Sequence, residues 1–92
     1  MSDEMLRFNE AMIRDTLDHL SNIELDMVTL AWEGEKRTRA KIIVQYRCGG
    51  RNRLLCYRVN DSALSNVDER AHWLSEVLAF VEHDKQMTDR SE

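Results

Sequence analysis

Five side chains in this 92-residue sequence could bind a metal ion or transfer protons near neutral pH: His19, His72, His83, Cys48 and Cys56. Their spacing does not assemble a site. His72 and His83 lie eleven residues apart on one predicted helix, which separates them by roughly 16 Å along the axis. The two cysteines have no second pair of ligands at the spacing of a zinc site. We therefore predict no metal site, solvated histidines and reduced, structural cysteines.

The carboxylates are abundant, but they fall on the polar faces of the predicted helices, where charge commonly keeps a protein in solution. No pair of them lies in the apolar surroundings that raise a carboxyl pKa for general acid or base catalysis. The sequence also has no glycine-rich phosphate loop, no serine elbow and no cysteine–histidine pairing. We predict that the protein is not an enzyme and uses no cofactor and no small-molecule substrate.

The basic residues are concentrated in the middle of the sequence. From Glu35 to Arg58 there are eight basic residues and one acidic residue. Residues 1–34 carry eight acidic and two basic residues, and residues 59–92 carry eight acidic and three basic ones. Like charges crowded on one element reduce stability unless carboxylates of the flanks or of a partner neutralise them. The basic middle segment is therefore the candidate interaction surface.

Composition and periodicity predict a single domain over residues 1–92. The chain is 42 % hydrophobic and 33 % charged and has no proline, which favours regular elements. Apolar residues recur at helical spacing near both ends and alternate in the middle. The predicted elements are a helix over 3–21, strands over 23–33, 38–48 and 53–60, a helix over 66–85 and a frayed polar tail over 86–92. The predicted fold class is α+β, in the order α-β-β-β-α, with a three-stranded antiparallel sheet packed with two amphipathic helices.

The strand over 38–48 has the clearest alternation and defines the two faces of the sheet. The face expected beneath the helices holds Ala40, Ile42, Val44, Leu55, Tyr57 and Val59. Gly49 and Gly50 supply the positive φ of a two-residue hairpin, in which Val44 pairs with Leu55. A four-residue loop would shift the pairs by two positions and preserve the faces. In the first strand the alternation changes phase once, which predicts a bulge near Met27 unless its second face is also covered.

The opposite face of the sheet is the predicted partner-binding surface. If the first strand keeps the same pleat, cations surround an apolar centre of Leu25, Met27, Ile43, Leu54 and Cys56. The residues predicted to bind the partner are Arg39, Lys41, Ile43, Arg47, Leu54 and Arg58. Both helices offer wider apolar arcs than a small two-layer domain buries, so we also expect a homodimer. The aromatic rings of Trp32, Trp73 and Phe80 are expected in the core.

These features predict a small non-enzymatic protein-interaction module: an adaptor, a chaperone or an inhibitor of a larger protein, of phage or bacterial origin, by analogy with other small acidic α+β chains. The alternative is a nucleic-acid-binding protein that uses the same basic sheet. The element order resembles that of the double-stranded RNA-binding domain, a likeness of topology alone. At the lysine-rich start of that family's second helix this sequence has Asp68 and Glu69, and its net charge is −4. Both features favour a protein partner.

The N-terminus, Met1-Ser2-Asp3-Glu4, has neither the basic start nor the apolar stretch of a signal peptide. Nowhere does the sequence contain about 18 consecutive apolar residues, the length that a membrane-spanning helix needs. We therefore expect a cytoplasmic protein that does not bind membranes.

Overall fold

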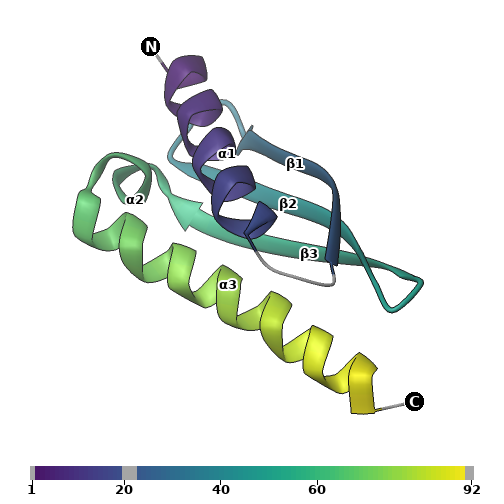
Figure 1. The fold of residues 1–92 in the computed structure, drawn as a ribbon. Coiled ribbons are helices and arrows are strands. Elements are labelled where there is room, and N and C mark those ends of the chain that lie inside the picture. Colours follow the sequence, from purple (N-terminus) through teal and green to yellow (C-terminus); the bar gives the residue numbers. More distant parts are fainter. Residues whose placement is uncertain (1, 20–22, 91–92) are drawn as a thin grey trace.

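The computed structural model describes residues 2–19 and 23–90 of the chain. The elements in chain order are α1 (Ser2–Asp18), β1 (Ile23–Glu33), β2 (Arg39–Cys48), β3 (Arg51–Asn60), α2 (Asp61–Ser65) and α3 (Val67–Arg90) (Figure 1). The strands form one antiparallel sheet in the order β1-β2-β3. The predicted α+β class with three antiparallel strands is confirmed, and the short helix α2 is an addition to the expected order.

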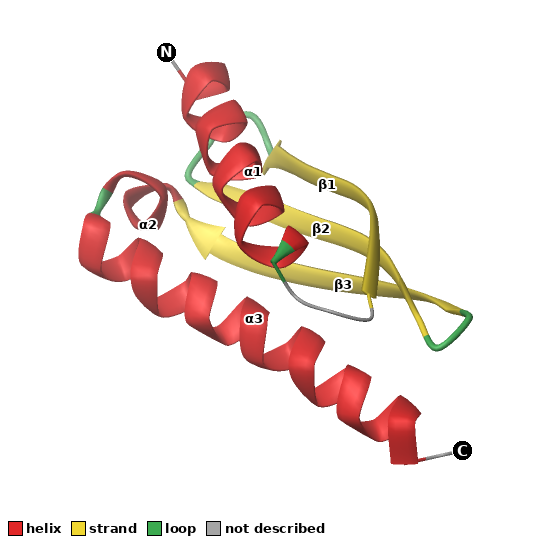
Figure 2. Cartoon of the chain, in the orientation of Figure 1, coloured by secondary structure: helices red, strands yellow, loops and turns green. Residues whose placement is uncertain are grey.

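The two long helices cover one face of the sheet. Helix α1 crosses the sheet, and α3 runs beside β3 along most of its length (Figure 2). Burial along β2 alternates at every residue, with Ala40, Ile42 and Val44 fully buried and the residues between them exposed or half-buried. Because successive residues of a strand point to opposite faces, this alternation means that only one face is covered. We call the other side the open face.

The hydrophobic core lies between the covered face and the helices. The helices contribute buried residues to it, which are Leu6, Ile13, Leu17, Leu64, Trp73, Val77 and Val81. Burying an aliphatic side chain of this size contributes about 1.5–3 kcal/mol. The Trp73 indole N–H donates a hydrogen bond of 2.9 Å to the Ala63 carbonyl, so its one polar group is satisfied inside the core.

The hairpin between β2 and β3 has the two-residue form. Gly49 and Gly50 have φ values of 58° and 77°, and positive φ at both positions gives the turn whose twist matches that of the strands. Val44 pairs with Leu55 and Cys48 with Arg51. The register predicted for a two-residue turn is confirmed, and the four-residue alternative is excluded.

The phase change of β1 is a bulge, one residue earlier than the predicted position. The register shifts between Leu25 and Met27, which leaves Asp26 as the extra residue. Leu25 then pairs with Tyr46 and packs against the core. The prediction that Leu25 lies on the open face was therefore wrong, whereas Met27, opposite Gln45, does lie there.

Two helix boundaries differ from the prediction. Helix α3 continues to Arg90, so the residues predicted as a frayed tail are helical over 86–90, and residues 91–92 lie outside the described residues. Helix α1 ends at Asp18, and the predicted end over residues 20–21 also lies outside the described residues. At the start of α3 the Asn66 side-chain oxygen accepts a hydrogen bond of 3.0 Å from the Glu69 N–H, as expected of an N-cap.

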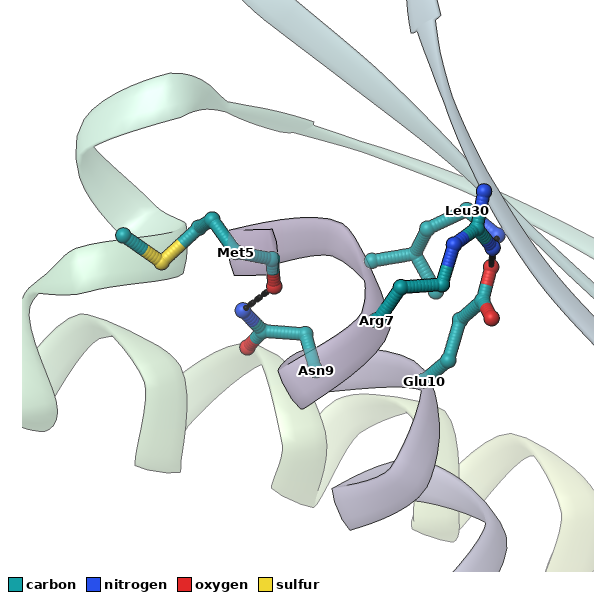
Figure 3. A network of polar contacts seen from close by, with 5 residues as sticks. All are labelled: Met5, Arg7, Asn9, Glu10 and Leu30. Atoms are coloured by element: carbon teal, nitrogen blue, oxygen red, sulfur yellow. Dashed lines mark hydrogen bonds and ion pairs between the residues drawn. The ribbon is translucent and has the colours of Figure 1, made fainter. Parts of the chain in front are cut away.

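The buried side of α1 also differs from its apolar pattern. Phe8 is apolar and yet half-exposed, and the Arg70 guanidinium lies 5.0 Å from its ring centroid. Asn9 is fully buried instead. Its amide nitrogen donates to the carbonyls of Met5, at 2.8 Å (Figure 3), and Leu64, at 3.3 Å. The side chain of Asn9 therefore ties α1 to α2.

The one-sided core predicts opposite costs for two adjacent isoleucines of β2. Ile42 is fully buried and Ile43 lies half-buried on the open face. We expect Ile42→Ala to lower the free energy of unfolding by about 2–5 kcal/mol, because it leaves a cavity beneath the helices. The matched variant Ile43→Ala should cost less than about 1.5 kcal/mol. Urea denaturation of both variants checks this, and equal losses would contradict the assignment of faces.

Candidate partner-binding surface

The open face carries an exposed apolar centre. The strand register places the side chains of Met27, Ile43, Leu54 and Cys56 on it, from all three strands. Leu54 is 65 % exposed and Met27 is 39 % exposed, while Ile43 is half-buried. All six residues predicted to bind a partner lie on this face: Arg39, Lys41, Ile43, Arg47, Leu54 and Arg58.

Three cations gather at one end of the open face. Lys41 lies directly opposite Arg58, and Arg39 is next along β2 on the same side. Arg58 reaches across β2 to Glu33, with 2.9 Å between its Nε and a carboxylate oxygen. Arg39 and Lys41 have no ion pair among the described residues. We call Arg39, Lys41 and Arg58 the basic cluster, and with Glu33 it carries a net charge of +2, which is unfavourable in the isolated protein.

The other end of the open face is close to neutral. Arg47 Nη1 lies 3.4 Å from a carboxylate oxygen of Glu24, and its Nε donates to the Asn52 side-chain oxygen at 3.3 Å. Exposed pairs of this kind contribute about 0–1 kcal/mol. Asp26, Arg47 and Leu54 help to line a shallow depression of about 360 Å³ here. Arg47 therefore adds less uncompensated positive charge to the open face than the basic cluster does.

Arg53 belongs to the covered face, where α3 neutralises it. Its Nε donates at 2.8 Å to Asp84, with a second bond from the guanidinium to the same carboxylate, and Tyr46 O–H donates to Asp84 at 2.6 Å. The bond from Arg53 lowers the pKa of Asp84, and the bond to Asp84 raises the pKa of Arg53. Burial, followed by the bond to Asp84, raises the pKa of Tyr46. This network fastens the C-terminal half of α3 to β2 and β3.

A second tyrosine, Tyr57, joins α3 to the edge strand β3. Tyr57 O–H donates a hydrogen bond to Glu76, and that bond, followed by burial, raises the pKa of Tyr57 to about 12. The sequence did not indicate either acidic partner, Glu76 or Asp84, because the carboxylates of the helices were expected to face solvent. The spacing of a helix residue and a strand residue far apart in the chain gives no signal for such a contact.

The cysteines and histidines lie where the sequence placed them. Cys48 is buried on the covered face and Cys56 is exposed on the open face, and both are free thiols. All three histidines are exposed, and His72 Nε2 lies 3.1 Å from Glu76. Over residues 2–19 and 23–90, no three metal-ligating side chains cluster as an ion would require.

The aromatic residues follow the prediction in part. Trp73 is buried, as expected, and Trp32 is half-buried against the core. Phe80 is 56 % exposed, so its expected place in the core was wrong. With Ala79 and His83 it borders a small depression on the outer side of α3.

No protein-family model matches the chain, and comparisons with curated proteins and with solved structures likewise gave no match. Within the part of the chain that the structure describes, none of the helices combines the length and apolar character needed to cross a membrane.

The Asp84 network predicts how stability depends on pH. Because the pKa of Asp84 is lower in the folded state, its contribution is present above the pKa of the unfolded chain, about 4, and is lost as pH falls through the folded pKa. The pKa of Tyr46 is raised, so its contribution is present below about 10 and is lost at higher pH. We expect Asp84→Asn to unfold more easily than the wild type at pH 7, with a difference that shrinks towards pH 2. Urea denaturation across this range measures it, and a constant difference would contradict the network.

Proposed function

We propose that the protein is a small non-enzymatic protein-interaction module, an adaptor, chaperone or inhibitor, that docks on a larger protein through its open face. The occupant is a protein surface with an apolar patch bordered by carboxylates. The observation that carries the proposal is the exposure of Leu54, 65 %, in an apolar centre beside the basic cluster. Soluble proteins rarely expose an apolar patch with a charged border unless it is an interaction site.

Charge complementarity selects the chemistry of the partner. The basic cluster has three cations and one internal carboxylate, Glu33, so carboxylates of a partner would relieve the repulsion between Lys41 and Arg58. Charges at the border of an interface mainly set the rate and specificity of association, while the apolar centre supplies the affinity. The open face is therefore suited to recognising an acidic surface with an apolar centre.

The size of the open face favours a reversible complex. The three strands have eleven, ten and ten residues. They form a surface roughly 33 Å long and 14 Å wide, with a projected area of about 460 Å². A standard protein interface buries about 800 Å² per partner. An adaptor or inhibitor that binds and dissociates fits this area better than a permanent subunit.

The exposed, free thiol of Cys56 suits a reducing compartment, which supports the proposed cytoplasmic location of the protein.

The proposal predicts that two open-face substitutions weaken binding without unfolding the protein. The partner is first identified by affinity capture from the host and purified. We expect Leu54→Glu and Lys41→Glu each to weaken its binding by at least about tenfold. Arg14→Glu, an exposed position of α1 on the opposite side of the sheet, is the matched control and should bind like the wild type. Isothermal calorimetry measures the affinities and circular dichroism checks folding. Equal binding by Leu54→Glu would refute the proposal.

Self-association stays a prediction, and the same variants decide whether a second copy occupies the open face. Sedimentation of the purified wild type at micromolar concentration reports the oligomeric state. A dimer that Leu54→Glu dissociates would assign the open face to a second copy and contradict the proposed acidic partner. A monomer would contradict the homodimer prediction.

Nucleic-acid binding is the second candidate, favoured by the basic cluster alone. Carboxylates beside Arg47 and Arg58 oppose it, because they would repel phosphates on the same face. We expect no binding of random duplex or single-stranded oligonucleotides at about 50 mM salt. A fluorescence anisotropy titration tests this. Micromolar affinity that decreases steeply with salt would favour the nucleic-acid alternative instead.

A further inference from the structure

The two edge strands of the sheet, β1 and β3, differ in what occupies their outer edges. At β1 the Glu10 carboxylate accepts a hydrogen bond of 2.8 Å from the Leu30 N–H and forms an ion pair with Arg7 (Figure 3). At β3 no side chain of the described residues hydrogen-bonds to the backbone. An edge with open N–H and C=O groups is a template for a further strand. Among the described residues, the β3 edge is therefore the less occupied of the two.

Two observed hydrogen bonds establish which backbone groups of β3 point outward. Leu30 N–H points away from β2, so its pair partner Ile42 bonds towards β3, and Tyr57, opposite Ile42, bonds back to β2. The bond of 2.9 Å from Asp61 N–H to the Thr38 carbonyl continues the same alternation at the end of β3. The outward-pointing N–H groups therefore belong to Leu54, Cys56, Arg58 and Asn60.

A groove of about 600 Å³ lies along this edge. Four consecutive residues of β3, 57–60, line one wall together with Arg39. The other wall comes from α2 and the first turns of α3, and it carries Asp68, Glu69 and His72. Four strand residues span roughly 13 Å. The volume lies within the range of about 300–1,000 Å³ that is usual for ligand sites. The groove has the length and the backbone groups to hold an extended peptide segment.

We propose that this groove binds an extended segment of a partner protein as a fourth strand on β3, and that the segment alternates acidic and apolar residues. Side chains of an added strand alternate between the two faces of the sheet. On the open face they would lie beside Arg58 and near Arg39. On the covered face they would lie beside Tyr57 and Val59, next to the buried ring of Trp73. Carboxylates fit the first environment. Aliphatic side chains fit the second, because Asp68 and Glu69 of α3 line the groove on that side and would repel carboxylates.

A second copy of the chain is a poorer occupant of this edge. Strand β3 carries Arg51, Arg53 and Arg58 and no acidic residue. Antiparallel pairing of two β3 strands would bring these arginines close to one another, and like charges across a strand pair are destabilising. The edge therefore favours a strand of opposite charge. The groove shares Arg39 and Arg58 with the open face but not the apolar centre, so a variant of the apolar centre tests the two apart.

Titration of the ¹⁵N-labelled protein with a blocked octapeptide of alternating valine and glutamate tests the proposal. We expect the amide signals of Cys56, Arg58 and Asn60 to shift and saturate with a Kd below about 1 mM. An octapeptide of alternating valine and lysine should bind at least about tenfold more weakly. No shift at these amides, or equal binding of the two peptides, would overturn the proposal.

Asn60 offers a matched pair of variants for the same titration. Its φ of −76° suits proline, and its side chain makes no capping hydrogen bond, so Asn60→Pro removes one outward N–H with little strain. We expect Asn60→Pro to weaken binding of the valine–glutamate peptide about tenfold. Asn60→Ala, which keeps the N–H, should leave binding of this peptide unchanged. Equal affinities of the two variants would refute strand addition. If Asn60→Pro fails to fold, Arg39→Glu, which should reverse the preference between the peptides, provides the decisive comparison.

Leu54→Glu separates this groove from the open face. The Leu54 side chain lies in the apolar centre and does not line the groove. We expect Leu54→Glu to retain the peptide-induced shifts of Arg58 and Asn60, even if it loses the larger partner. Loss of the peptide with this variant would mean that the open face binds it, and would overturn the groove proposal.

Discussion

The burial of one side of β2 beneath two helices is the constraint on which the rest of the structure depends. Ala40, Ile42 and Val44 have no exposed surface, and residues of a strand alternate between its faces. Covering these three therefore places Arg39, Lys41 and Arg47 on the other side. The position of the cations follows from the position of the core, and shifting the register by one residue would bury the charges and expose the aliphatic side chains.

The molecule neutralises its basic segment unevenly, and this unevenness defines the surface. Asp84 of α3 forms an ion pair with Arg53 on the covered face. On the open face, Glu24 pairs with Arg47 and Glu33 pairs with Arg58. At the end of the sheet where Arg39 and Lys41 lie, positive charge remains in excess. The groove along β3 begins at the same end, with Arg39 and Arg58 in its wall. Arg39 and Arg58 therefore belong to both surfaces, and an acidic partner could contact them from either one.

The sequence predicted the sheet better than the helices for a physical reason. A period of two assigns faces without ambiguity, and two glycines with positive φ set the hairpin register. Helix faces have diffuse borders. Phe8, at the edge of the apolar arc, is half-exposed, whereas Asn9 is buried and its amide nitrogen donates to carbonyls of α1 and α2. The bulge at Asp26 moved Leu25 to the core. The contacts of Glu10 and Asp84 join segments distant in sequence, and the groove beside β3 depends on where α3 lies, so no local pattern could predict them.

The central claim is that the sheet has one covered face and one open face, and the two cysteines report on it directly. Cys48 is 2 % exposed beneath the helices, and Cys56 is exposed beside Leu54 on the open face. Maleimide labelling of the native protein, followed by peptide mapping, compares their reactivities. We expect rapid modification of Cys56 alone, with Cys48 reacting only after denaturation. Reaction of Cys48 at a similar rate, or protection of Cys56 in the monomer, would contradict it.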